Sequence, residues 1–179
     1  SPSSLEGGDR VNLGRLLGLE AVRAMERGDV VHAWCEAMNW VDDGSPDDAT
    51  LAELARAVMP RMPASEAAAL AAEFRAWMGA DAIRAALSRS AYPTGPDVSV
   101  RVETERPFIR RVGDEIQEGS MDRLVLVERE GRVTEAHVLD FKTDAIESGD
   151  EAVLEERTRL YRPQIEAYRE VVQEQYGLE

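Results

Sequence analysis

The hydrophobic pattern of this chain changes its period, and that change restricts the possible folds more than any other feature. From residue 98 to residue 105 apolar and polar side chains alternate, with Val98, Val100 and Val102 on one side. A period of two is typical of a half-buried strand, whereas the apolar residues before Pro93 recur at helical spacing. We therefore expect a helical first half, followed by a part that is built around a β-sheet.

The chain is predicted to form one domain in two parts. Residues 12–90 make the helical part, and residues 98–176 make the sheet and a C-terminal helix. The predicted helices span residues 13–26, where Gly28 interrupts the pattern, and residues 29–40, 51–59, 65–78, 81–88 and 151–176. The predicted strands span residues 98–105, 120–128 and 133–141, with a hairpin turn at residues 130–132. The predicted fold class is α/β.

The amino-acid composition limits the kinds of protein that this chain can be. The chain has 179 residues, enough for one domain with a substantial core. It has no apolar run long enough to span a membrane. Cys35 is the single cysteine, which excludes an internal disulfide and favours a reducing, cytoplasmic compartment. The net charge of −14 argues against a protein that coats nucleic acid. Because the sequence begins Ser-Pro-Ser-Ser without a Met, we expect it to be part of a longer protein.

An acid and a base come together at the end of a predicted strand. Asp140 and Lys142 alternate with Phe141, so they are expected on one face, with Phe141 on the other. Such a pair can hold a divalent metal and a negatively charged substrate side by side. Asp122 begins the preceding strand. If the two strands pair, both carboxylates can converge on one metal ion.

Five short segments also follow one another in a specific order. They are residues 27–32 (RGDVVH), 105–108 (ERPF), 119–124 (GSMDRL), 138–143 (VLDFKT) and 161–168 (YRPQIEAY). Together they resemble the RecB-like branch of the PD-(D/E)XK nuclease superfamily. Each segment alone is a weak signal, whereas five in order are a strong one. Residues 39–97 contribute no motif to the resemblance.

The resemblance implies a role for each matching residue. Asp122 and Asp140 would bind a Mg²⁺ or Mn²⁺ ion, together with the carbonyl of Phe141 and a nitrogen of His32. Lys142 would position the attacking water and stabilise the charge of the transition state. Glu105 would bind the metal directly or through water, but Glu103 shares its strand face and is an alternative.

Two further residues lie on the C-terminal helix. Gln164 and Tyr168 are four residues apart and so share a face. They would brace the site or contact the DNA backbone, although Tyr168 could equally serve only to pack the helix on the sheet. The neighbouring arginines 157, 159 and 162 fit a solvated face as well as a phosphate-facing one.

The resemblance also implies a fold and partners. The expected core is restriction-endonuclease-like, with a mixed β-sheet flanked by helices. Members of this branch typically form the C-terminal nuclease domain of UvrD-like helicases of the exodeoxyribonuclease V type, which process double-strand ends. The expected partners are therefore DNA, as a single strand delivered by a helicase, and the linked or associated helicase domain itself. No iron–sulfur cluster is expected, because a cysteine set is missing.

Two other functional classes remain to be weighed. The chain could keep the nuclease fold but serve only to bind DNA or dock a partner subunit. Against this, both Asp140 and Lys142 are present, whereas a decayed site usually loses one of them. A small-molecule enzyme has little support, because the sequence contains neither a phosphate-binding glycine loop nor a nucleophile elbow.

Overall fold

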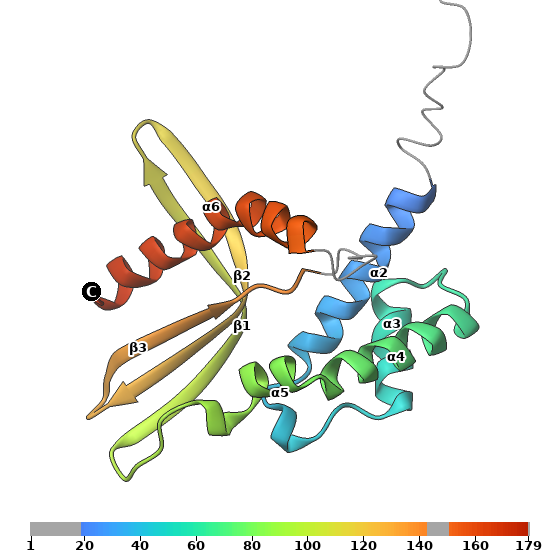
Figure 1. The fold of residues 1–179 in the computed structure, drawn as a ribbon, viewed down its shortest axis with the longest axis horizontal. Helices are drawn as coiled ribbons and strands as arrows, with labels where there is room; N and C mark the ends of the chain where they lie inside the picture. The colour runs from blue at the N-terminus through green and yellow to red at the C-terminus, as the bar shows by residue number, and fades with distance from the viewer. Residues whose placement is uncertain (1–18, 143–150, 179) are drawn as a thin grey trace, which may run out of the picture.

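The computed structural model describes residues 19–142 and 151–178, with side chains described for residues 24–142 and 155–178. These residues combine a group of helices, a three-stranded antiparallel sheet and one long helix, α6 (Figure 1). The helical group contains α2 (Leu19–Glu36), the 3₁₀ turn η1 (Val41–Asp43), α3 (Asp48–Val58), α4 (Ala64–Gly79), α5 (Asp81–Leu87) and the 3₁₀ turn η2 (Arg89–Ala91). The sheet contains β1 (Val98–Val112), β2 (Glu115–Arg129) and β3 (Arg132–Leu139), and α6 spans Glu151–Tyr176. The expected change from helices to strands is confirmed.

The first described helix runs through Gly28 without a break. The prediction of two helices separated at this glycine is therefore wrong, and the predicted start at residue 13 lies outside the described residues. Gly28 and Val30 are buried, and Trp34 lies in the core of the helical group. This burial outweighs the roughly 1 kcal/mol that a glycine costs inside a helix. The helix also ends earlier than predicted, at Glu36.

The sheet is a meander in the order β1-β2-β3, and both pairings are antiparallel. The expected mixed sheet is therefore not found among the described strands. The turn between β2 and β3 lies where it was predicted, and its central residues Glu130 and Gly131 have φ angles of 52° and 76°. Positive φ at both positions is the conformation of the type I′ turn that joins twisted antiparallel strands.

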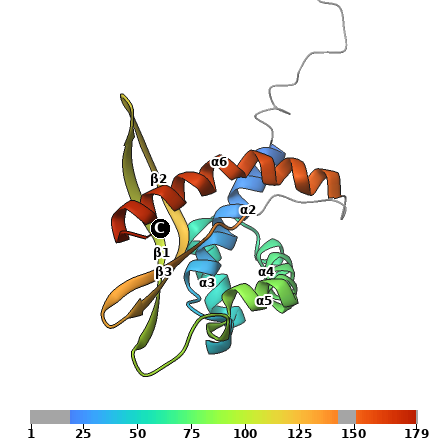
Figure 2. The same cartoon turned by 60° about the vertical axis from the view of Figure 1, so that its left-hand side comes forward.

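The first hairpin is much longer than predicted. β1 continues to Val112 rather than residue 105, and β2 begins at Glu115 rather than residue 120. Gly113, with a φ of 62°, makes the tight turn between them. Arg106, Phe108 and Arg110 are the half-buried positions of this extension, whereas Ile109 is exposed. Apolar and polar side chains therefore do not follow the burial, and the sequence lacks the alternation that marks a half-buried strand. Figures 1 and 2 show that the hairpin projects beyond α6.

The second half of the middle strand, β2, is buried on both faces. Leu124 and Leu126 pack against α6, where Tyr168 and Val172 are buried. The opposite face carries Val125 and Val127, which pack with Trp40 and Tyr92. The continuous apolar run of β2 thus reflects a sheet that α6 covers on one face and the helical half covers on the other.

None of the helices in the described part of the chain combines the length and the apolar character that crossing a bilayer requires.

Gly119 permits a close contact within the first hairpin. It lies opposite Phe108 in the β1–β2 ladder. A Cβ at this position would lie 2.8 Å from Cε1 of Phe108. The Phe108 ring cannot move away freely, because it packs edge-on against Tyr168 with ring centroids 5.4 Å apart. A side chain at residue 119 would therefore disturb the contact between the sheet and α6.

We expect the substitution Gly119→Ala to lower the free energy of unfolding by about 1–3 kcal/mol, the usual cost of overpacking. Urea denaturation followed by circular dichroism measures this change. The matched control is Gly79→Ala, because a Cβ there meets nothing within 4 Å and should leave stability unchanged or slightly raised. Wild-type stability of Gly119→Ala would show that the Phe108 ring has room to move.

Candidate functional site

The regular pairing of β1 with β2 is interrupted at Glu105 and Asp122. Thr104 pairs with Arg123 and Arg106 pairs with Met121, but the two acids between them do not pair. Glu105 has a φ of 46°, a left-handed conformation that costs energy for a residue other than glycine. Such strained backbone is often found at functional sites.

The break also changes which side chains of β2 face α6 and which face the helical half. Beyond it, Leu124 and Leu126 pack with α6, and Val125 packs with the helical half. Strict alternation would place Met121 with Val125, yet Met121 packs with α6. The alternation is therefore reset at Asp122. The distorted backbone at this point presents the two acids to the helical half.

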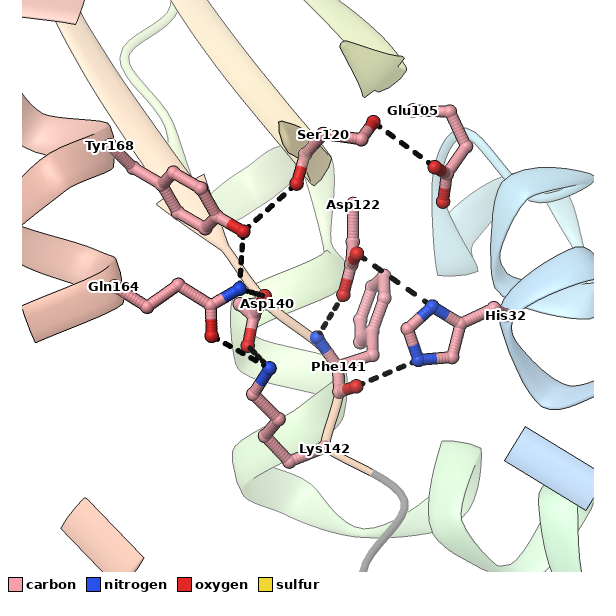
Figure 3. A network of polar contacts seen from close by, with 9 residues as sticks. All are labelled: His32, Glu105, Ser120, Asp122, Asp140, Phe141, Lys142, Gln164 and Tyr168. Atoms are coloured by element: carbon pink, nitrogen blue, oxygen red, sulfur yellow. Dashed lines mark hydrogen bonds and ion pairs between the residues drawn. The ribbon is translucent and has the colours of Figure 1, made fainter. Parts of the chain in front are cut away.

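Three possible metal ligands meet at the distortion. His32 from α2, Glu105 from β1 and Asp122 from β2 each offer one ligand atom, and these atoms all lie within 4.8 Å of one another (Figure 3). Two carboxylates and an imidazole suit Mn²⁺ well and are compatible with Mg²⁺. The donor set therefore fits the cation that the resemblance implies.

The peptide of Phe141 links two of these residues. Its N–H donates to Oδ2 of Asp122 over 2.6 Å, and its carbonyl accepts from Nε2 of His32 over 2.8 Å. Because a carbonyl can only accept, the proton of a neutral His32 lies on Nε2. The lone pair of Nδ1 then faces Oδ1 of Asp122, 3.7 Å away. Two acceptors that face each other in this way are suited to share a cation.

Burial raises the pKa of the Asp122 carboxyl above its ordinary value. The hydrogen bond from Phe141 and the proximity of His32 oppose this effect, whereas Asp140 and Glu105 add to it through charge repulsion. The groups around Asp122 therefore do not fully offset the cost of its negative charge. A bound divalent cation would supply the missing positive charge.

A second group of polar residues lies directly beside the first. The ammonium of Lys142 contacts Oδ2 of Asp140 at 2.6 Å and donates to Oε1 of Gln164 over 3.0 Å. The amide nitrogen of Gln164 lies 3.5 Å from Oδ1 of Asp140 and also contacts the Tyr168 hydroxyl. This confirms the prediction that Asp140 and Lys142 share a side and that Gln164 and Tyr168 share a helix face. Phe141 lies on the other side, against the helical core.

The charge on Lys142 is well stabilised. Burial alone would lower the pKa of this amine, but the hydrogen bond and the negative charge of Asp140 outweigh it and raise the pKa. The side chain also lies over the Tyr161 ring, 4.6 Å from its centroid. Lys142 therefore stays positive at neutral pH and is suited to stabilise negative charge rather than to act as a base.

Ser120 joins the two groups and was missed by the sequence interpretation. Its carbonyl accepts from the Tyr168 hydroxyl over 2.9 Å, and its hydroxyl donates to Oε2 of Glu105 over 3.1 Å. Burial raises the pKa of Tyr168, which keeps the hydroxyl protonated as a donor. The position of Ser120, two residues before Asp122, was the only hint in the sequence.

The structure places every predicted site residue in this network. These residues are His32, Glu105, Asp122, Asp140, Phe141, Lys142, Gln164 and Tyr168. Glu103 lies outside the network and pairs with Arg101 and Arg106, so Glu105 is the acid that reaches the site. The last residue of the VLDFKT segment, Thr143, lies outside the described residues.

Two details differ from the sequence prediction. β3 ends at Leu139, so Asp140 and Phe141 follow the strand instead of closing it. Asp140, predicted to bind metal, lies against Lys142 and does not belong to the group formed by His32, Glu105 and Asp122.

The sequence held one further signal for this site. Lys142 is the single lysine among the 21 basic residues, and the other 20 are arginines. A lysine offers a compact point charge with three rotatable donors, which the planar guanidinium group cannot reproduce. The single lysine of this arginine-rich chain thus lies at the candidate site.

Cys35 does not contribute a nucleophile. Its thiol is buried in the helical core, and burial raises its pKa to about 12. A thiol with this pKa is protonated and unreactive at neutral pH.

No known family model matches the sequence, and no curated protein or solved structure shows significant similarity to it. The resemblance to RecB-like nucleases therefore rests on the motifs themselves.

Proposed function

We propose that this chain is a Mg²⁺- or Mn²⁺-dependent DNA nuclease domain that hydrolyses phosphodiester bonds. The observation that supports it best is the meeting of the His32, Glu105 and Asp122 ligand atoms, with the Lys142 ammonium beside them. These residues come from separate segments of the chain. No structural requirement of the sheet explains why four ionisable side chains should gather where its pairing is broken.

The chemistry would be divided between the two groups of residues. His32, Glu105 and Asp122 would hold the cation, with Phe141 orienting the first and the last of them. A divalent cation bound there would polarise the scissile phosphate and lower the pKa of a coordinated water. Lys142 would offset the negative charge that grows on the phosphate during attack. Gln164 would keep the ammonium in place.

The same proposal covers the fold family, the DNA substrate and the partner. The sheet and α6 would form a restriction-endonuclease-like core, and the chain would act on single-stranded DNA delivered by a linked UvrD-like helicase at double-strand ends. The acidic total charge agrees with a site that accepts DNA only after a cation has neutralised its carboxylates.

An alternative is a catalytically inactive module that binds DNA or docks a subunit. It is favoured by the position of Asp140, which Lys142 and Gln164 engage and which stands apart from the three grouped ligands. Binding of Mn²⁺ without any DNA cleavage would support this alternative.

The substitution Asp122→Asn tests the proposal. Wild type is expected to cut single-stranded DNA with Mg²⁺ or Mn²⁺ and not with EDTA. Loss of even an outer-shell partner typically costs about 10–100-fold in metal affinity or activity, so Asp122→Asn should lower both by at least about 100-fold. Titration of Mn²⁺ followed by electron paramagnetic resonance measures the affinity, and a labelled oligonucleotide measures the cleavage.

The matched control is Asp114→Asn. This acid lies at the turn of the first hairpin with a fully exposed side chain, so its replacement should change neither quantity. Equal Mn²⁺ affinity in wild type and Asp122→Asn would refute the assigned metal site.

A further inference from the structure

Arg123 is a buried cation without a carboxylate partner in the described part of the chain. Only 1% of its surface is exposed. Its Nη1 donates to the carbonyl of Met38 over 3.1 Å, and its Nη2 donates to the carbonyl of Asn39. The guanidinium also lies over the Trp40 ring, 5.1 Å from its centroid, while Nε has no hydrogen-bond partner among the described residues. A charge buried in this way is costly, and an apolar side chain would fill the space more cheaply.

The contacts of Arg123 connect two parts of the molecule. Met38 and Asn39 follow the end of α2, and Arg123 is the neighbour of Asp122 on β2. The guanidinium thus ties carbonyls just beyond the C-terminal end of α2 to the strand position next to a proposed ligand. Positive charge at a helix C-terminus is favourable, which fits this attachment.

The same two elements carry His32 and Asp122. Their facing atoms, Nδ1 and Oδ1, are 3.7 Å apart, and this distance depends on how α2 is placed along β2. We propose that Arg123 is a positioning residue that sets the spacing of His32 and Asp122 and thereby the metal affinity of the site. The inference rests on the proposed function, because it concerns the same metal ligands.

A double-mutant cycle on Mn²⁺ affinity tests this role. Arg123→Lys keeps the charge but loses the fork that reaches both carbonyls. It is expected to weaken Mn²⁺ binding about tenfold, at the lower end of the usual effect of outer-shell residues. In a His32→Ala background, where the spacing no longer matters, the same change should weaken binding by less than about twofold. Electron paramagnetic resonance measures the affinities after circular dichroism has shown that each variant is folded.

The matched control is Arg89→Lys. Arg89 lies over the same Trp40 ring, 5.2 Å from its centroid, but its side chain is 54% exposed and pairs with Asp43. Its replacement should leave Mn²⁺ affinity unchanged. If Arg123→Lys does not fold, Arg123→Gln takes its place in the cycle, because an uncharged amide is cheaper to bury.

The possible outcomes separate the two proposals. An unchanged affinity in the folded Arg123 variant would overturn the positioning role and leave the metal site intact. An equal loss in both backgrounds would also overturn it, because the effect would then be a general loosening unrelated to His32. A wild type that binds no Mn²⁺ would refute the proposed function, and the positioning role with it. A loss confined to the background with His32 supports the inference.

Discussion

The substitution Lys142→Ala is expected to lower the rate of single-stranded DNA cleavage by about 10²–10³-fold, the usual effect of removing a group that stabilises transition-state charge. The ammonium is held by Asp140 and Gln164 beside the proposed metal ligands, and its raised pKa keeps it charged at neutral pH. The loss should appear in kcat rather than in Mn²⁺ affinity, because Lys142 is a cation and cannot bind the metal. Single-turnover cleavage together with Mn²⁺ titration separates the two effects.

Two controls make this result specific. Arg132→Ala removes an exposed positive charge at the far end of β3 and should leave the rate unchanged. The second control is a folding check: the Asp140 side chain is only 5% exposed, so Lys142→Ala leaves a nearly buried carboxylate without its cation and is expected to lower the melting temperature. Cleavage is therefore compared at a temperature at which circular dichroism shows that both proteins are folded. A fully active Lys142→Ala would refute the role assigned to Lys142, whereas a wild type that cuts no DNA would favour the inactive module.

The substitution Trp34→Ala is expected to lower the free energy of unfolding by about 3–5 kcal/mol, as truncation of a large core aromatic usually does. Trp34 is 0% exposed, packs with its ring centroid 5.3 Å from that of Phe74, and donates from Nε1 to the carbonyl of Leu51 over 2.9 Å. A domain is typically stable by only about 5–15 kcal/mol, so this is a large share of the total. Urea denaturation followed by circular dichroism gives the difference.

The control for this variant is the same replacement at another tryptophan. Trp77 on α4 is 37% exposed, so Trp77→Ala should cost clearly less than Trp34→Ala. Because α2 carries both Trp34 and His32, Trp34→Ala should also weaken Mn²⁺ binding at temperatures where the protein is still folded. Equal stability of the two variants would show that the helical core does not depend on Trp34.

The sequence predicted elements well where one face of a segment is buried. The alternating valines of β1, the turn at Glu130 and Gly131, and the helix that carries Gln164 all lie where they were expected. The prediction was wrong where local preference and packing disagree. Gly28 breaks helices in isolation, yet burial keeps α2 continuous through it. The outer half of the first hairpin lacks an apolar–polar alternation because arginines occupy two of its half-buried positions, Arg106 and Arg110, while Ile109 is exposed.

In the candidate site too, some contacts follow from the sequence and others only from the tertiary structure. The sequence by itself determined that Gln164 and Tyr168 share a face, because residues four apart on a helix are placed by local geometry. It also predicted that Asp140 and Lys142 lie together, and they do so through their ion pair although β3 ends before them. Which segments meet was decided only in the tertiary structure. There the break in the β1–β2 ladder selects Glu105 over Glu103 and brings it to His32 and Asp122. Arg123 of β2 donates hydrogen bonds to the carbonyls of Met38 and Asn39, just beyond the end of the helix that carries His32. Contacts between residues so distant in the chain depend on packing and on strained backbone, and neither leaves a periodic trace in the sequence.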